Sequence, residues 1–329
     1  MKIYFKEAAM EKKLVVNPDQ TPDKKLLDWL EQYFKQQHEI NSQLLRGVKE
    51  FGKGLTLDDL QRIIEHRHIV KPVIKSSSND WTIPILEAER KAHLAFFGQE
   101  FGLLMFAEKL KKIGPKKIAW WKRNFFEVHC PPPHVFKQGV NLPGMEIAIP
   151  DNYYRELANG NVFRDVNGEL IKIDKAETEG VTVLIDTRLK PAYDSGVQMW
   201  KRDGIVGGVM KKLRKDGRIT NYYSRNSRFN SSADHEMNFI LQAAASALKV
   251  KSCRLETTTE RIVIPQLYRH MPRKDDGKTN TSIWCDEFYR YRRDRFGGGN
   301  SDCGGLADVY ADGAGYRWRS RSFRFLAVL

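Results

Sequence analysis

The chain has 329 residues, of which 41% are hydrophobic and 29% are charged, and its formal net charge is +14. This composition is typical of a globular protein with a hydrophobic core, and the length allows two domains. No apolar run approaches the roughly 20 residues that span a bilayer, and residues 1–16 lack the apolar centre of a secretory signal. These features exclude a membrane-spanning protein, and we expect a cytoplasmic protein with no membrane partner.

Residues 1–112 are expected to form a helical N-terminal region. Apolar side chains recur at helical spacing over 23–37, and Thr56 is a favourable N-cap for a second helix. A third helix is expected over about 84–112, because Pro84 suits its first turn and Gly114-Pro115 breaks the pattern. We predict that this region couples binding to a second partner or to assembly, and that a chain lacking it still folds.

Residues 116–329 are expected to form a second domain that begins with short strands. Apolar runs predict strands over 118–128, 145–149 and 181–185. Asn167-Gly168 is the strongest hairpin signal in the chain, because a two-residue type I′ turn needs positive φ at both central residues.

Helical patterns return between 210 and 265. The basic run MKKLRKDGR predicts a helix end at Gly217, and apolar spacing predicts a helix over about 232–249. Thr257 and Glu260 form a capping box that opens a short helix, which Pro265 must shorten or bend. Helices and short strands therefore occur in separate blocks, and the sequence predicts the α+β class.

The last 42 residues, 288–329, differ in composition from the rest of the chain. They contain eight arginines and no lysine, glutamate, glutamine or methionine, whereas the preceding residues contain 30 lysines and 17 arginines. Tyr, Arg, Asp, Ser, Asn, Cys, Gly and Ala, which interrupt a Gly, Leu, Val and Phe skeleton, all have codons that end in cytosine. Randomising the two adenines of AAC asparagine codons produces only codons that end in cytosine. The bias therefore indicates a binding surface that was made by mutation and then selected.

The order of motifs in residues 116–329 resembles the C-type lectin fold, in its formylglycine-generating-enzyme and sulfatase-modifying-factor branch. The residues that carry the resemblance are Arg254, Leu255, Thr257, Trp284, Gly298, Gly299, Ser301, Phe323, Arg324 and Leu326. GGGNSDCGGLADVY followed by SFRFLAVL is similar to the variable proteins of diversity-generating retroelements. Ser322 departs from this family, which usually has glycine before Phe-Arg.

The resemblance implies a non-enzymatic ligand-binding protein with a hypervariable region over about 288–321 on a fixed scaffold. Inward-facing scaffold residues would be Phe296, Leu306, Val309, Phe323, Leu326 and Val328. Tyr and Arg also dominate binding hot spots. The predicted ligand-binding residues share one solvent-facing patch: Tyr289, Tyr291, Arg292, Arg293, Asp294, Asn300, Asp302, Cys303, Asp308, Tyr310, Asp312, Tyr316, Arg317, Arg319 and Arg321.

Two other functions stay open at this point. The net charge and the basic, aromatic run YRYRRDR are compatible with nucleic-acid binding, but the tail's own charge is only +4 (eight Arg minus four Asp). Interleaved acids favour a protein or a mixed-polarity ligand as the partner. A formylglycine-generating-type oxidase would need a second cysteine a few residues after Cys303, and none is present at 304–310.

Other chemistry has little support in the sequence. The four cysteines form no CxxC pair, which favours free thiols: Cys130, Cys253, Cys285 and Cys303. The histidines that could act in a site are scattered along the chain: His129, His134, His235 and His270. We therefore predict no catalytic residues, no cofactor and no metal site.

Overall fold

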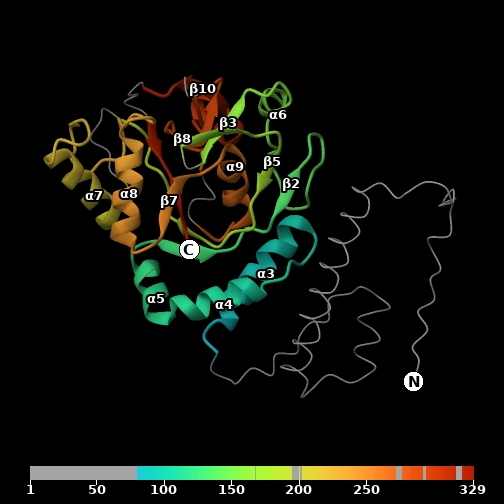
Figure 1. Ribbon diagram of the computed structural model, residues 1–329. Helices are drawn as coiled ribbons and strands as arrows, with labels where there is room; N and C mark the ends of the chain where they lie inside the picture. The colour runs from blue at the N-terminus through green and yellow to red at the C-terminus, as the bar shows by residue number, and fades with distance from the viewer. Residues whose placement is uncertain are drawn as a thin grey trace, which may run out of the picture. The chain divides into compact units, whose positions relative to one another are not determined.

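The computed structural model describes residues 80–166, 168–194, 200, 202–271, 276–291, 294–315 and 321–329 (Figure 1). All of them belong to one compact unit, Ser77–Leu329. This unit combines helices with mainly antiparallel sheets, which confirms the α+β prediction. The helices expected over 23–37 and after Thr56 lie outside the described residues. In the described part, no helix is long and apolar enough to cross a bilayer.

Three helices open the described chain: α3 (Ile83–Phe97), α4 (Leu104–Ile113) and α5 (Pro115–Arg123). The single helix expected over 84–112 is divided, because Gly98 takes a left-handed conformation with φ 72° that ends α3. The strand expected over 118–128 is wrong in its first half, where α5 buries Trp121. Pro115 stands at the start of α5, where its missing N–H costs nothing.

Two larger sheets and a short ladder contain the strands. The four-stranded antiparallel sheet has, in spatial order, β1 (Phe126–His129), β6 (Val183–Asp186), β12 (Phe325–Val328) and β7 (Ser252–Leu255). The six-stranded sheet has β10 (Val309–Gly313), β9 (Asp294–Gly298), β8 (Ser282–Tyr289), β3 (Val162–Val166) and β4 (Glu169–Lys172), with β11 (Arg321–Phe323) parallel to β8. The short ladder joins β2 (His134–Phe136) and β5 (Ala176–Thr178).

Two of the expected strand features are confirmed and one is wrong. The hairpin at Gly168 joins β3 and β4, with φ 93° at that glycine, and the strand expected over 181–185 is β6. Residues 145–149 form no strand. The side chain of Gln266 instead pairs with the backbone of Ile147, accepting from its N–H at 2.8 Å and donating to its carbonyl at 3.0 Å. The Gln266 amide thus satisfies the backbone N–H and carbonyl of Ile147, which a neighbouring strand would otherwise have to do.

Four further helices complete the unit: α6 (Asp151–Ala158), α7 (Gly204–Lys215), α8 (Met237–Leu248) and α9 (Thr258–Leu267). The capping box of α9 is confirmed, since Thr257 Oγ1 accepts from the Glu260 N–H at 3.0 Å and the Glu260 carboxylate accepts from the Thr257 N–H at 2.9 Å. The helix continues two residues beyond Pro265. Two short 3₁₀ helices, η2 (Ser301–Cys303) and η3 (Gly305–Ala307), follow β9.

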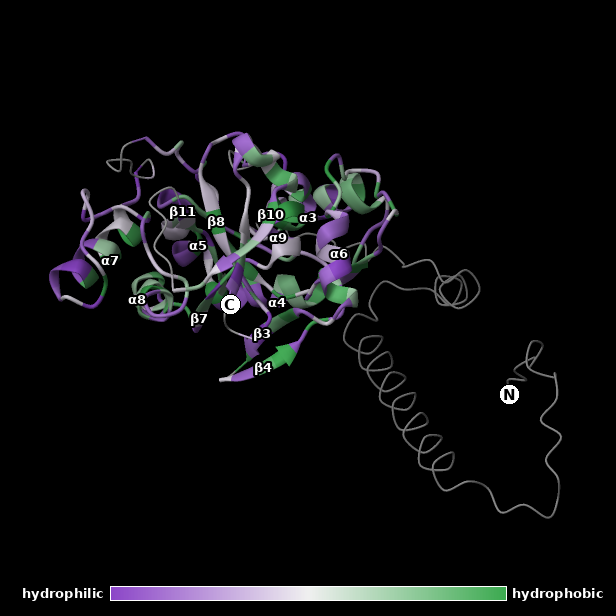
Figure 2. Ribbon diagram, turned by 90° about the horizontal axis from the view of Figure 1, so that it is seen from above, coloured by the Kyte–Doolittle hydropathy of each residue, from purple (hydrophilic) through white to green (hydrophobic). Residues whose placement is uncertain are grey.

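The four-stranded sheet separates two hydrophobic cores. On β12, Phe325 and Ala327 face the core that contains α5, α7 and α8, whereas Leu326 faces the core that contains α6 and α9. This alternation follows from the two-residue period of a strand. Both views place α7 and α8 on one side of the described unit and α6 on the other (Figures 1 and 2).

The unit begins at Ser77 and so includes α3 and α4. The boundary expected at residue 112 assigned these helices to the N-terminal region. Each contributes to the cores, α3 through Phe96 and Phe97 and α4 through Phe106 and Leu110.

Candidate ligand-binding cleft

Ten of the fifteen predicted ligand-binding residues are described. Three are exposed (Tyr291, Asp302 and Cys303), and five are half-buried (Tyr289, Asp294, Asn300, Tyr310 and Asp312). Asp308 and Arg321 are buried, with 9% and 4% of their surface exposed, so the prediction that they face solvent is wrong. The remaining five lie outside the described residues: Arg292, Arg293, Tyr316, Arg317 and Arg319.

Asp308 is buried because it stabilises the turn between β9 and β10. Its carboxylate accepts from the Asn300 N–H at 3.3 Å, and its carbonyl accepts from Nη2 of Arg261 on α9 at 2.7 Å. Burial raises the pKa of the Asp308 carboxyl, while the Asn300 N–H and the Arg261 charge act in the opposite direction. The residue therefore acts as part of the scaffold.

Arg321 is buried because its guanidinium lies against Trp284, 4.0 Å from the ring centre. Its Nη2 donates to the Tyr310 hydroxyl at 2.8 Å and to the Asp312 carboxylate at 3.1 Å. The structure thus brings Tyr310, Asp312 and Arg321, all predicted from the tail, into one cluster on the six-stranded sheet.

The other predicted residues lie elsewhere, so the single patch is wrong for the described part of the tail. Tyr291 stacks on Phe163, with ring centres 4.9 Å apart, and Tyr289 packs edge-on against Phe296. Asn300 caps η2, where its side chain accepts from the Asp302 N–H. Tyr289 lies on β8, whereas Tyr291 follows β8 and Asn300 follows β9 outside the strands, so the fold separates these positions.

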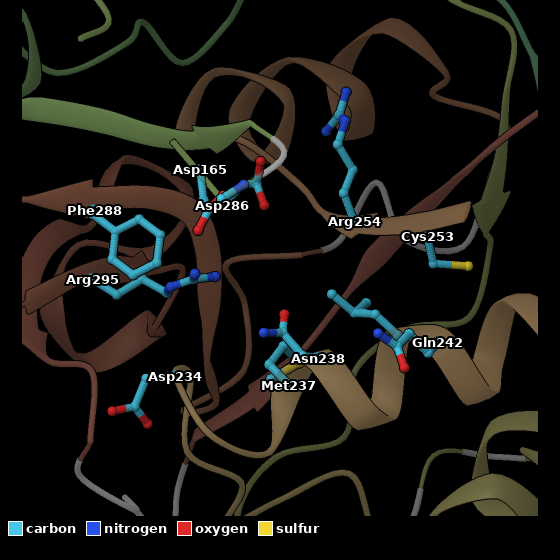
Figure 3. A pocket seen from close by; sticks show the side chains of 12 residues that line it. Asp165, Asp234, Met237, Asn238, Gln242, Cys253, Arg254, Asp286, Phe288 and Arg295 are labelled. Carbon is cyan, nitrogen blue, oxygen red and sulfur yellow. The ribbon is translucent and has the colours of Figure 1, made fainter. Parts of the chain in front are cut away.

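A cleft of about 550 Å³ lies between the six-stranded sheet and α8 (Figure 3). Its sheet side carries Asp286, Phe288 and Arg295. Its helix side carries Asp234, Met237, Asn238, Leu241 and Gln242. Figure 3 shows the Arg295 side chain reaching toward the centre beside the Phe288 ring, with Asn238 rising from α8 toward the same space.

Arg295 is the central cation of this cleft. Its guanidinium lies 4.0 Å from the Phe288 ring centre, and only 8% of the residue is exposed. Nη1 reaches the Cys285 carbonyl at 3.4 Å, and Nε has no hydrogen-bond partner among the described residues. Burial lowers the pKa of Arg295, while the Asp286 and Glu287 carboxylates act to raise it. A buried guanidinium with an unused donor is suited to a ligand that brings an acceptor.

The cleft and the Arg321 cluster share one face of the sheet. Arg295 pairs with Phe288 on β8 and with Asp312 on β10. Directly paired residues of neighbouring strands point to the same face. A continuous polar face therefore runs from Arg295 through Asp312 to Arg321.

Acidic side chains balance the arginines around the cleft. The Asp286 carboxylate accepts from Arg164 Nε at 3.1 Å. Arg254 forms a two-pronged ion pair with Glu260, each oxygen accepting at 2.6 Å. The Asp234 side chain, 31% exposed, lies at the α8 end of the cleft. Charges of both signs therefore surround the space, which suits a mixed-polarity ligand better than a polyanion.

The four cysteines are free, as the sequence predicts. Cys285 is fully buried, and burial raises its pKa to about 12. Cys303 is exposed in η2. The two thiols therefore differ in their accessibility.

The histidines are less scattered in space than in sequence. His129 and His270 lie with ring centres 5.8 Å apart, and Glu127 stands between them. The fold thus brings together two histidines that are scattered in the sequence.

Searches of protein-family models, of curated proteins and of solved structures gave no match to this chain. Only the geometry of the cleft therefore supports its assignment as a candidate binding site. Sequence reasoning missed Arg295, Asp286 and Asp234 as cleft residues. Arg295 lies within the arginine-rich tail and could have been found there, whereas the two aspartates carry no pattern that distinguishes them from ordinary surface acids.

Proposed function

We propose that this protein is a non-enzymatic ligand-binding protein and that the cleft between the six-stranded sheet and α8 is its binding site. The observation that carries the proposal is the buried guanidinium of Arg295, which stacks on Phe288 with its Nε unsatisfied inside a cleft. Pockets with a few convergent polar groups and an aromatic wall are typical of ligand sites.

The ligand is expected to carry both an acceptor and a donor. An acceptor such as a carboxylate or amide oxygen would lie against Arg295 and Phe288. A donor would lie against Asp234, whose carboxylate is only partly shielded from solvent. A peptide segment or a small zwitterionic molecule has this chemistry.

The proposal includes a C-type-lectin-like scaffold with a hypervariable C-terminal segment, as the resemblance implies. It is supported by the lysine-free tail, and by the burial of five of the six residues expected to be fixed, Val328 being half-buried.

The nucleotide sequence of the gene tests the hypervariable origin. Codons for Tyr289, Tyr291, Tyr310 and Asp312 should end in cytosine, and a near-copy with AAC at these positions should lie beside a reverse transcriptase gene. Ordinary third-base usage with no such copy would reject the hypervariable origin.

Ligand binding is tested by a thermal-shift screen of the full chain against a panel of peptides and zwitterionic small molecules. Compounds that raise the melting temperature of the wild type are then titrated into Arg295→Gln and Arg155→Gln. Arg155 lies on α6 with 68% of its side chain exposed, so its replacement is a matched control away from the cleft. We expect Arg295→Gln to weaken binding by about 10-fold or more, the usual result of removing a charged hydrogen bond.

Equal affinity of the wild type and Arg295→Gln for every compound found would show that the ligand does not bind in this cleft. A panel without any stabilising compound would remove the support for a small or peptide ligand.

Nucleic-acid binding is the alternative, and the interleaved carboxylates of the cleft argue against it. It predicts that affinity for a random oligonucleotide falls steeply with salt, because each neutralised phosphate releases counterions. Fluorescence anisotropy at 50 and 200 mM salt (roughly the range over which such binding is lost) distinguishes this alternative from the cleft proposal.

A further inference from the structure

The cluster of Glu127, His129 and His270 lies on elements that do not line the cleft. Glu127 and His129 are two residues apart on β1, so their side chains lie on the same face of this edge strand. His270 follows α9 in the chain and reaches the cluster from the turn after that helix. No pattern in the sequence relates His270 to β1, because 143 residues separate His270 from Glu127.

Two O–N distances within the cluster match the edges of a metal coordination shell. Oε2 of Glu127 lies 3.4 Å from Nε2 of His129 and 3.3 Å from Nε2 of His270. The three candidate ligand atoms, one from each residue, all lie within 4.8 Å of one another. A Zn²⁺ ion about 2.0–2.1 Å from each of its tetrahedral ligands separates those ligands by about 3.3–3.4 Å. The two measured O–N distances therefore leave room for an ion with little movement of the side chains.

A buried carboxylate orients the histidine at the centre of the cluster. Nδ1 of His129 lies 2.8 Å from Oε2 of Glu89 on α3. With the Nδ1 proton donated to that carboxylate, Nε2 is the nitrogen that faces Glu127, and it would bind an ion after losing its own proton. Histidines that bind metals are commonly held by such a carboxylate on their other nitrogen.

Glu89 is itself held in place. It is 2% exposed, and its carboxylate accepts from the Cys130 N–H at 2.8 Å and from the Tyr268 hydroxyl at 2.5 Å. The His129 ring lies on the Tyr268 ring, with centres 4.0 Å apart. The imidazole therefore has little rotational freedom, which lowers the entropic cost of binding an ion.

Nε2 of His129 faces this space and lies 3.4 Å from the Glu127 carboxylate, with which a protonated imidazole forms an ion pair. Only 8% of its side chain is exposed, and its Nε2 makes no hydrogen bond with any described residue. The His270 side chain is 55% exposed and the Glu127 side chain 27% exposed, so the cluster opens to solvent on one side. Three protein ligands with an open side leave one position for water or another small ligand.

We propose that Glu127, His129 and His270 bind a divalent transition-metal ion of the Zn²⁺ type. Two imidazoles and one carboxylate suit Zn²⁺ and its neighbours in the first transition row, and they disfavour Ca²⁺ and Mg²⁺, which prefer oxygen ligands throughout. The bound ion would connect the edge strand β1 to the turn after α9.

The test measures Zn²⁺ binding to the full chain by competition with a chromophoric chelator, and Co²⁺ binding by visible absorption. His270→Gln and Glu127→Gln each remove one ligand from the partly exposed side of the cluster, where a substitution disturbs packing least. His235→Gln is the matched control, since the His235 side chain is 81% exposed and lies beside Asp234. Circular dichroism of each variant verifies that its fold is retained.

At micromolar Zn²⁺ concentrations, we expect the wild type and His235→Gln to bind one more Zn²⁺ per chain than His270→Gln and Glu127→Gln do. Zn²⁺ should also raise the melting temperature of the first pair and not of the second, because binding to the folded state alone stabilises it. A tetrahedral Co²⁺ spectrum that His270→Gln lacks would support the same ligands.

Equal Zn²⁺ stoichiometry and affinity in the wild type and His270→Gln would overturn the proposal and leave the cluster as an ion pair between His129 and two carboxylates. Failure of this test leaves the cleft proposal unaffected, because Arg295 and the cluster lie on different elements and are probed with different ligands.

Discussion

Asp186 shows how much of this unit's stability depends on single buried charges. The residue is fully buried at the end of β6, and its carboxylate accepts from Arg188 Nε at 2.8 Å and from Arg228 Nη2 at 2.7 Å. Arg228 also binds Asp203 and lies over the Trp200 ring, 4.2 Å from its centre. Such a group of charges is tolerated inside a protein because each member has partners.

The pH dependence of stability should reflect this network. Burial by itself would raise the pKa of Asp186, but the charges of Arg188 and Arg228 outweigh it and hold the pKa below 3.8. Because the folded-state pKa is depressed, the contribution of Asp186 is complete above the unfolded pKa of roughly 3.9 and is lost as the pH falls through and below that value. We expect Asp186→Asn to cost about 3–5 kcal/mol at pH 7, because two buried guanidinium groups lose one of their two anions and keep only Asp203.

Urea denaturation at pH 7 and pH 3.5 measures both effects. The difference in unfolding free energy between the two pH values should be smaller in Asp186→Asn than in the wild type. An unchanged pH dependence would mean that the pKa of Asp186 is the same in the folded and unfolded states, which would contradict the effect of the two arginines.

At the scale of elements, the hairpin of β9 and β10 depends on close backbone contact between Gly298 and Asp308, beside the Arg261 side chain of α9. A Cβ on Gly298 would lie 1.8 Å from the Asp308 carbonyl oxygen, the atom that Arg261 of α9 holds by a hydrogen bond. Gly298 is thus a glycine because the two strands and the Arg261 guanidinium leave no space for a side chain. The same backbone places Arg295 and Asp312 on the face of the cleft.

Two glycine-to-alanine substitutions, which should change the stability in opposite directions, test this explanation. Gly298→Ala should destabilise the unit by about 1–3 kcal/mol or more, because the clash is with backbone and cannot be relieved by a rotamer change. Gly208→Ala should stabilise it by about 0.5–1 kcal/mol, since Gly208 lies inside α7 with no atom within 4 Å of a new Cβ. Thermal or urea unfolding of both variants gives the comparison. A Gly298→Ala protein as stable as the wild type would contradict the close packing of β9 and β10.

At the scale of the whole molecule, the described unit forms two cores around the four-stranded sheet. The C-terminal strand β12 lies between β6 and β7, so the last residues of the chain complete the centre of that sheet. α3 closes one core with Phe96 and Phe97, and its Glu89 supports His129 on β1. The unit therefore needs helices from before residue 112 as well as the very end of the chain.

Truncation distinguishes the two possible boundaries. A chain that starts at Ser77 should fold, whereas a chain that starts at Lys116 should be unfolded or aggregated. Loss of α3 and α4 exposes Phe96, Phe97 and the residues beneath them, and it leaves His129 without its buried carboxylate. Near-ultraviolet circular dichroism and limited proteolysis measure the outcome. A native-like spectrum for the chain from Lys116 would support the boundary that the sequence predicts.

Much of the local structure follows from the sequence, because the signals involved act over a few residues. The capping box at Thr257 and Glu260, the hairpin at Gly168 and the helix end at Gly217 each depend on hydrogen bonds or backbone angles within about one turn. The α+β class and most of the buried scaffold of the tail, such as Phe296 and Phe323, follow from the same local patterns.

The site depends on contacts between distant parts of the chain, which sequence patterns do not encode. Residue type alone predicts that the polar residues of the tail face solvent. Trp284 nevertheless covers Arg321, and Arg261 covers Asp308, and only the fold determines the positions of these two partners. Gln266 prevents a strand at Ile147 from 119 residues away.

Composition, caps and turns thus establish from the sequence alone that this is an α+β protein with an arginine-rich tail carried on a buried skeleton. Tertiary structure decides which arginine faces the cleft and which lies inside, and it brings His270 to His129. The reason is physical: a helix cap needs only its neighbours, whereas the environment of a charged side chain is set by whatever the fold packs against it.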